Sequence, residues 1–453
     1  MKNKSLRVLL SAPGFFPHIS GGGQVYVYRL TKELLKRNHE VTIITSAPWN
    51  EENGANCIDS YTYENIPVVS FRLNPKEVSY KESQLGFGPL TSKFLYKFLN
   101  ECRPDIVHIN GIKPAFTSLC NELNISHLIT AHHAGIICPA GTLVKEDGSI
   151  CDRAANTTDC VPCCNFWRRP KWYTGGMLGK IPAFIYRRIG KKLNDSKKLS
   201  YIERGLIYSY LVEQSIETKK MMIEQAQHYI APSRAMHDLL IRNGCDPKKI
   251  TIIPHGIELL KKLPIEKFDG RPVRFGYVGR VDRLKGLHVL LEALELLPDG
   301  KTCELHIFGA ARNPWDQEYF EKTLNLYKGK SKVFKHGFIS HERLIEVYSI
   351  IDVLVIPSLL PEAFGLVVAE AFSAGRPVIL FNSGGLAEQV TDGVSGFVVK
   401  SFDKYSLAEV IQMVVNNPNI ITEMSSRSPN VKTTAEHAGE IETIYRELFL
   451  PAP

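Results

Sequence analysis

The sequence has no apolar run of about eighteen residues, the length that a membrane-spanning helix needs. Its basic first residues, 1–7, are followed only by the short apolar run 8–10, which is too short for the core of a secretory signal. No repeat of solenoid period and no low-complexity tract is present. These absences disfavour a helical membrane protein, a secreted protein and a repeat array, and we expect a cytoplasmic protein.

The composition is ordinary for a globular protein, with 44% hydrophobic and 23% charged residues. A chain of 453 residues is too long for one core, so two domains of about two hundred residues each are expected. The 10 cysteines, in a cytoplasmic chain, indicate thiols or a metal site rather than disulfides.

Short apolar runs alternate with helical patterns in both halves of the chain, beginning with a strand at 6–10, a helix at 25–37 and a strand at 41–45. Such alternation predicts α/β domains with parallel sheets flanked by helices. We expect a first domain at 1–254, a polar linker at 259–271, and a second domain at 272–416 that opens with a strand at 273–278. Residues 435–448 have the pattern of a final helix.

Two carboxylates eight residues apart, Glu362 and Glu370, stand in the apolar run 362–377. A buried helix over 366–374 is predicted, and an ionised carboxylate on it must find partners, for which ligand hydroxyls are candidates. Backbone N–H groups of Phe364, Gly365 and Leu366 at the helix start can bind an anion. These features together describe a sugar-nucleotide pocket. The alternative is a buried helix with one satisfied glutamate.

Three segments, 275–286, 362–377 and 384–399, resemble in order and spacing the donor-binding half of the retaining GT-B glycosyltransferases of family 4, also called glycosyl transferases group 1. The first half of the chain is similar to the same family at residues 8–14, 21–23, 104–110, 131–133, 231–233 and 253–256. The resemblance implies the GT-B fold, in which two Rossmann-like doubly wound parallel-sheet domains face each other across a cleft. It also implies that the final helix, within 435–453, packs back on the N-terminal domain.

The resemblance assigns the donor diphosphate to Arg280 and Lys285, together with the helix start at Gly365 and the glycine after the strand, Gly279. Cations and helix N–H groups can stabilise a leaving diphosphate without a metal. The chain has no Asp-x-Asp signature, in agreement with a site that requires no cofactor for catalysis. By the same resemblance, Glu370 binds the nucleotide ribose and Glu362 the donor sugar. A solvated loop with ordinary ion pairs is the alternative for the two cations.

His132 follows the apolar strand 128–130, and the family has His-Asp here, then Cys-Pro six residues after the His. Here His132, Cys138 and Pro139 match, whereas His133 replaces the Asp. The resemblance makes His132 a residue that contacts the donor sugar. No enzymic nucleophile is evident, so the leaving phosphate would act as the base. The glycines Gly21, Gly22 and Gly23 permit close approach to a phosphate or an acceptor, although a plain flexible turn is the alternative.

Residues 138–200 depart from the sheet-and-helix pattern and suggest adaptation to a particular acceptor. Cys138, Cys151, Cys160 and Cys163 could hold a structural zinc ion, but the first two are thirteen residues apart rather than paired. Free thiols are the main alternative, followed by an iron–sulfur cluster or a disulfide. The following segment, 166–198, carries ten cations and one acid among aromatic residues. It predicts contact with an anionic membrane surface, against the alternative of a solvated helix face.

The expected function is therefore transfer of a hexose-type sugar from a nucleotide-diphosphate donor to a glycan or lipid-linked acceptor in surface polysaccharide or glycoconjugate synthesis. The protein would be cytoplasmic or peripheral on the inner face of the membrane. Nucleic acid is not expected as a partner, because no nucleic-acid fold signature accompanies the basic segment. A nucleotide-sugar epimerase or hydrolase of the same fold, or a catalytically silent nucleotide-sugar-binding protein, are the alternatives.

Overall fold

A computed structural model describes residues 4–17, 21–47, 57–85, 87–145, 147–167, 182–193, 196, 199, 201–298 and 303–449. The chain divides into two units, the first formed by residues 1–254 and 434–453 and the second by residues 255–433. Among the described residues, no helix combines the length and apolar character needed to cross a bilayer.

Unit 1 contains an eight-stranded sheet in the order β3-β4-β2-β1-β5-β6-β7-β8. Neighbouring strands pair in parallel except β3 and β4, which are antiparallel. The central strands are almost wholly buried, as expected for a parallel sheet covered on both faces. The strands are β1 (Arg7–Ala12), β2 (Glu40–Ser46), β3 (Cys57–Tyr63), β4 (Ile66–Arg72), β5 (Ile106–Ile109), β6 (Ser126–Thr130), β7 (His228–Ala231) and β8 (Ile250–Ile252).

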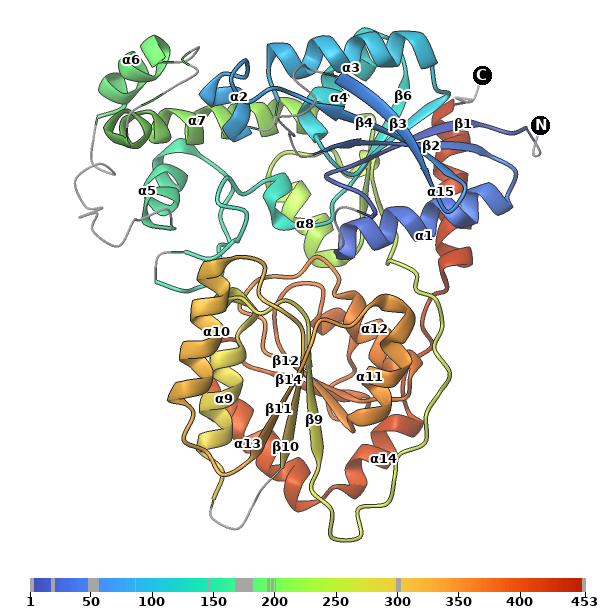
Figure 1. Cartoon of the computed structure of the whole chain (residues 1–453), viewed down its shortest axis with the longest axis vertical. Helices are drawn as coiled ribbons and strands as arrows, with labels where there is room; N and C mark the ends of the chain where they lie inside the picture. The colour runs from blue at the N-terminus through green and yellow to red at the C-terminus, as the bar shows by residue number, and fades with distance from the viewer. Residues whose placement is uncertain are drawn as a thin grey trace. The chain divides into compact units, whose positions relative to one another are not determined.

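Helices cover both faces of this sheet (Figure 1). One face carries α1 (Gly22–Lys36) and α15 (Thr434–Phe449), which contact each other, and the other carries α3 (Pro89–Cys102), α4 (Lys113–Glu122) and α7 (Tyr201–Gln225). The C-terminal α15 contributes Ile441 and Tyr445 to the core of unit 1. The remaining helices are α2 (Tyr80–Leu85), α5 (Thr157–Trp167), α6 (Ala183–Leu193) and α8 (Arg234–Arg242).

Unit 2 has a six-stranded parallel sheet in the order β11-β10-β9-β12-β13-β14. Figure 1 shows α9, α10 and α13 on one side of it and α11 and α12 on the other. The strands are β9 (Arg274–Val278), β10 (Glu304–Phe308), β11 (Lys332–Gly337), β12 (Val353–Ile356), β13 (Val378–Phe381) and β14 (Gly396–Val399). The helices are α9 (Leu287–Glu295), α10 (Pro314–Leu326), α11 (Leu344–Ile350), α12 (Leu366–Ser373), α13 (Lys404–Asn416) and α14 (Asn419–Ser426).

In each sheet the strand order reverses next to the first strand, between β1 and β5 in unit 1 and between β9 and β12 in unit 2. Ligands of doubly wound sheets bind at this switch point, beyond the carboxyl ends of the strands. Unit 2 continues past the boundary expected at residue 416, because Ile421 of α14 belongs to its hydrophobic core. The segments that follow β9 and β12 therefore lie at the predicted ligand edge of unit 2.

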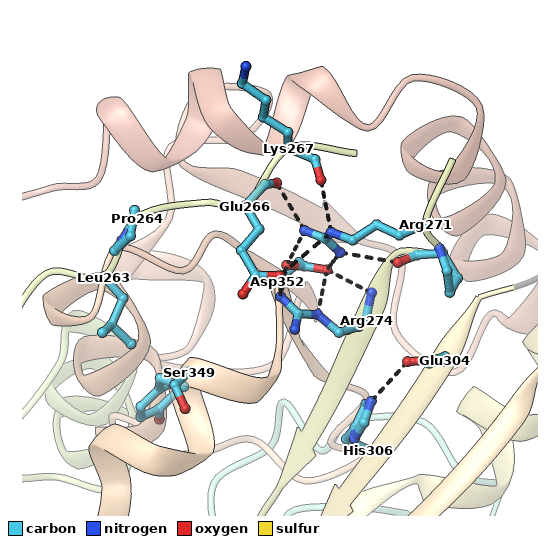
Figure 2. Close-up of polar contacts among 12 residues, drawn as sticks. Leu263, Pro264, Glu266, Lys267, Arg271, Arg274, Glu304, His306, Ser349 and Asp352 are labelled. Atoms are coloured by element: carbon cyan, nitrogen blue, oxygen red, sulfur yellow. Dashed lines mark hydrogen bonds and ion pairs between the residues drawn. The ribbon is translucent and has the colours of Figure 1, made fainter. Parts of the chain in front are cut away.

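A buried cluster of charges fixes the start of unit 2 at the opposite edge of its sheet (Figure 2). Asp352, just before β12, is 0% exposed and accepts hydrogen bonds from Arg271 at 2.7 and 3.0 Å and from Arg274 at 2.9 and 3.2 Å. Burial alone would raise the pKa of Asp352, but the hydrogen bonds from the two arginines hold it below its usual value. The cluster thus ties the segment entering unit 2 to strands β9 and β12.

Candidate active site

The loop after β9 is ordered by its own side chains. Gly279, which follows the strand, has a φ of 150°, and Tyr277 donates a hydrogen bond to the carbonyl of Arg280 at 2.6 Å. Asp282 accepts hydrogen bonds from the backbone N–H groups of Leu284 and Lys285 at 3.0 and 3.1 Å, capping the turn η5 (Arg283–Lys285). This loop therefore presents Arg280 and Lys285 at the switch point.

Lys285 forms an ion pair with Glu362, and this contact joins the loop after β9 to the segment after β12. Ser358 donates a second hydrogen bond to the same carboxylate oxygen at 2.9 Å. Burial alone would raise the pKa of Glu362, but Lys285, followed by Ser358 and Arg280, holds it below its usual value. Glu362 is therefore an ionised carboxylate with a cation already beside it.

Two glycines let the backbones of this site pack closely. Gly286, with a φ of 76°, lies so near Pro357 that an added Cβ would be 1.9 Å from the Pro357 carbonyl oxygen. Gly384, with a φ of 61°, would place a Cβ 2.5 Å from the carbonyl oxygen of Glu362. That same carbonyl accepts a hydrogen bond from the N–H of Gly385 at 2.7 Å. Larger residues at either position would displace the segment that carries Glu362.

Helix α12 begins immediately after this segment, as predicted, with Gly365 as its N-cap at a φ of 84°. Gln389 donates a hydrogen bond to the carbonyl of Phe364, which fixes the approach to the helix beside Leu366. Glu370 lies one turn into the helix and is 1% exposed. Its carboxylate is a secondary cause, after burial, of the raised pKa of Tyr348 on α11. The helix start thus follows directly after the segment that carries Glu362, and Glu370 is buried within the same helix.

Arg312 is a cation at this edge that the sequence analysis did not identify. It follows β10, which pairs with β9, and its pKa is lowered by burial and by the nearby charge of Arg280. A signal was present in the sequence, because Arg312 comes just after the end of an apolar strand. Ser358 and Gln389 were also missed, since their partners lie 4 and 25 positions away and the contacts form only in the folded loops.

In unit 1, the three glycines form a helix start rather than the loop that was expected. Gly21 is the N-cap of α1, and Gly22 and Gly23 are its first residues. The helix therefore begins before residue 25, where the apolar pattern starts. The first two residues of the helix have no side chains, and the N–H of Val25 donates to the carbonyl of Gly21 at 3.0 Å.

His132 lies after β6, and its Nε2 is 2.6 Å from Oδ1 of Asn110, which follows β5. The ring of Tyr26, on α1, meets the His132 ring edge-on with centroids 4.6 Å apart. His133 has a separate role, because its Nδ1 accepts a hydrogen bond from the N–H of Gly135 at 3.0 Å. His133 therefore caps the turn η2 (Ala134–Ile136), which is a task that an Asp commonly performs.

The structure does not support the predicted zinc site at Cys138, Cys151, Cys160 and Cys163. None of the four forms a disulfide, and in the part of the chain that is described no three His, Cys, Asp or Glu side chains are grouped so that they could hold a metal ion. The Cys163 thiol is 3.8 Å from the carbonyl oxygen of Val144. Its neighbour Cys164 packs in an apolar cluster with Val212 and Ile216. Cysteines of this segment thus contact the local backbone or pack in an apolar cluster.

The basic segment is described only in part, since residues 168–181, 194–195 and 197–198 lie outside the described residues. Within α6, Tyr186 is buried and Arg187 is paired with Glu213 of α7 through hydrogen bonds of 2.9 and 3.0 Å. Phe184 is 72% exposed. Arg188, Lys191 and Lys192 are exposed as well.

Comparisons with known proteins agree with this arrangement. Residues 261–431 match the family model described as glycosyl transferases group 1, and residues 20–154 match that of glycosyltransferase family 4. An alpha-D-kanosaminyltransferase of Streptomyces kanamyceticus is 29% identical over 187 residues, or 40% of this chain and 47% of the relative. A D-inositol 3-phosphate glycosyltransferase of Xylanimonas cellulosilytica is 30% identical over 208 residues, or 43% and 49%. The chain thus spans about half the length of these curated relatives.

Solved structures resemble nearly the whole chain. A sucrose-phosphate synthase from Thermosynechococcus elongatus has a TM-score of 0.69 at 21% identity, covering 98% of this chain and 99% of its own. The Anabaena protein HepE, solved with UDP and glucose, has a TM-score of 0.63 at 16% identity, covering 98% and 100%. At these identities the likeness establishes the fold.

Proposed function

Since the chain belongs to the GT-B glycosyltransferases of the group 1 and family 4 type, we propose that it transfers a hexose-type sugar from a nucleotide-diphosphate donor to an acceptor, with retention at the anomeric carbon. The observation that carries this proposal is the Lys285–Glu362 pair at the switch point of unit 2, beside the start of α12. It combines a cation for phosphate, a carboxylate for hydroxyls and a helix N-terminus for anions.

In the proposed reaction, the charge that develops on the departing diphosphate is met by Arg280, Lys285 and the N–H groups that open α12. Lys285 is paired with Glu362, so in the proposed complex its charge is divided between this carboxylate and the phosphates. Such preorganised donors stabilise the transition state because they need little reorganisation when the charge appears. The protein's own cations thereby supply this charge stabilisation, and no cofactor is required in the proposal.

Glu370 is assigned to the nucleotide ribose and Glu362 to the donor sugar. His132 is assigned to the donor sugar from unit 1. We assign the proton of the acceptor hydroxyl to the leaving phosphate, which accepts it on the face where the new glycosidic bond forms. Departure of the diphosphate and attack of the acceptor on one face of the sugar give retention.

The acceptor is proposed to be a glycan or a lipid-linked saccharide used in surface polysaccharide or glycoconjugate synthesis. Helix α6 supports a peripheral membrane role because exposed Phe184 and the exposed cations Arg188, Lys191 and Lys192 share one short helix. An apolar anchor among cations is the combination that binds anionic lipid surfaces. Arg187, in contrast, is engaged by Glu213 and is assigned to holding α6 on α7.

A thermal-shift screen against uridine, guanosine and adenosine diphosphate sugars tests the proposal, because a ligand that binds only the folded state raises the melting temperature. We would begin with uridine donors, since the similarly folded HepE was solved with UDP-glucose. The stabilising donor is then incubated with and without candidate acceptors. Product formed only with an acceptor supports transfer, whereas equal sugar release without one would indicate a hydrolase. Stabilisation by no sugar nucleotide would contradict the proposed donor site.

A further inference from the structure

Asn110 is oriented by two contacts that together define the protonation of His132. The Asn110 amide nitrogen donates to the carbonyl of His108 at 3.2 Å, which identifies the other amide atom, 2.6 Å from His132 Nε2, as the oxygen. An amide oxygen can only accept a hydrogen bond, so His132 Nε2 must carry a proton. In the neutral ring, Nδ1 is then the unprotonated nitrogen.

The position of Asn110 is itself strongly fixed. The residue is 4% exposed, and its backbone N–H donates to the hydroxyl of Ser11 at 3.1 Å. Ser11 in turn donates to the carbonyl of Gly111 at 2.8 Å, joining β1 to the end of β5. Lys113, at the start of α4, donates to the carbonyl of Asn110. Backbone and side chain are therefore both held, and the amide oxygen remains directed at His132.

The ring of His132 is held from a second side through the C-terminal helix. Nδ1 of His437, on α15, is 2.9 Å from the carbonyl of Pro254 and must donate to it. Nε2 of His437 is then an acceptor, and Tyr26 donates to it at 3.1 Å. Tyr26 places its ring against His132 at a centroid distance of 4.6 Å. One chain of contacts thus runs from α15 to His132.

We propose that Asn110 is a positioning residue that holds His132 as the Nε2–H tautomer, and that His437 and Tyr26 fix the orientation of its ring. The consequence is that Nδ1 of the neutral His132 ring is a hydrogen-bond acceptor of fixed direction. An amide oxygen can accept a hydrogen bond from neutral imidazole and carries no net charge, so Asn110 selects the tautomer without adding a negative charge that would favour imidazolium. The assignment of His132 to the donor sugar rests on the proposed function, whereas the tautomer does not.

The tautomer can be measured without any substrate, by ¹⁵N NMR of the full chain labelled at histidine, with the His132 signals identified from His132→Gln. We expect a protonated Nε2 and an unprotonated Nδ1 at neutral pH. Asn110→Leu should abolish this preference. Asn110→Asp should keep it and raise the pKa of His132 by about 1 to 3 units, as a carboxylate at this distance does. Asn121→Asp, which adds the same charge on the exposed side of α4, is the matched control.

Direct observation of His132 is needed because other titratable groups surround it, namely Tyr26 of α1, His108 of β5, Lys113 of α4, His133 of the same loop, and His437 and Tyr445 of α15. Burial alone lowers the pKa of Lys113 to about 7, so an activity profile would mix its titration with that of His132. A protonated Nδ1 in the wild type, or an unchanged His132 pKa in Asn110→Asp, would overturn the proposal. If the wild-type protein has the Nε2–H tautomer but transfers no sugar, the result would instead argue against the proposed function.

Discussion

At the scale of single residues, the two cations of the candidate site differ in what else they do. Arg280 makes an ion pair with Asp282 at 3.4 Å on its own loop, whereas Lys285 reaches across to Glu362. In the proposed mechanism, removing Arg280 deletes one contact to the diphosphate. Removing Lys285 also leaves the Glu362 carboxylate without the cation that holds its pKa down.

We therefore expect Arg280→Ala and Lys285→Ala each to slow transfer by on the order of a hundredfold, as removal of one transition-state donor does. In Lys285→Ala, burial should move the pKa of Glu362 upward, so that the acidic limb of the kcat profile shifts to higher pH. Arg280→Ala should show a smaller shift. Initial rates from pH 4 to 9 with saturating donor measure both effects. Normal turnover in both variants would show that the leaving-group site is elsewhere.

Substitutions of the two glutamates should affect different steps, one the binding of the donor and the other the turnover. Glu370→Ala is expected to raise the dissociation constant of the donor, because ribose contacts exist before and during reaction. Glu362→Gln is expected to lower kcat by on the order of tenfold or more with a smaller change in donor binding, since its charge acts on the developing positive charge. Calorimetric titration with the donor and steady-state kinetics distinguish the two. Small and equal effects would argue against both assignments.

The residues that the sequence predicted and those that it missed differ in a physical way. A helix start and a buried acid can be recognised from a short local pattern in the sequence. This pattern was sufficient to predict the positions of Glu362, Phe364, Gly365 and Glu370. Asn110 could not be predicted, because its role depends on the hydrogen bond to His132, which is twenty-two positions away and follows the next strand. Contacts between strand ends depend on the order of the strands in the sheet, and the local sequence pattern does not contain that order.

At the scale of elements, α6 combines two functions on opposite sides. Tyr186 and Gly190 are buried toward α7, and a Cβ on Gly190 would be 2.2 Å from the Tyr210 ring, so the two helices pack closely. The outer side carries Phe184 and the exposed cations. The segment's composition predicted a basic surface, but the engagement of Arg187 by Glu213 required the position of α7.

We expect the wild-type protein to bind vesicles containing anionic lipid, and binding to weaken with added salt because exposed charges are screened beyond about 10 Å at 0.1 M. Replacing Arg188, Lys191 and Lys192 with Ser should release it, and Phe184→Ser should weaken it at all salt concentrations. Cosedimentation measures both. The control replaces Lys328, Lys332 and Lys335 of unit 2 with Ser, removing the same charge. Equal loss in the control would mean that net charge, rather than α6, causes binding.

At the scale of the whole molecule, the alternation of strands and helices was sufficient to predict two parallel α/β sheets, because each strand-helix unit is local in sequence. The order of the strands in each sheet, in contrast, depends on the side of the first strand to which each crossover connection leads. A periodic sequence pattern does not show that side. The chain leaves unit 1 at residue 254 and returns at residue 434. Each unit therefore has its own core, and its stability can be examined separately.

Asp352 provides such a test for unit 2, because it joins the segment that enters the unit to two strands of its sheet. Asp352→Asn removes the buried anion that Arg271 and Arg274 share and leaves them with the exposed Glu266. Breaking a buried pair in this way costs about 3–5 kcal/mol. We expect calorimetry to show a lower melting temperature for one transition, with the transition of unit 1 unchanged. Glu346→Gln, which breaks the exposed pair with Arg343, should cost less than about 1 kcal/mol.

The difference in unfolding free energy between the wild type and Asp352→Asn should depend on pH, because the pKa of Asp352 is lowered in the folded state. A group with a depressed folded pKa stabilises the protein fully above its unfolded pKa, about 3.9, and loses that contribution as the pH falls through the folded value. Unfolding free energies of wild type and Asp352→Asn should therefore differ most at neutral pH and converge in acid. A difference that stays constant down to pH 2 would show that side-chain packing, rather than the charge of Asp352, holds the entering segment in place.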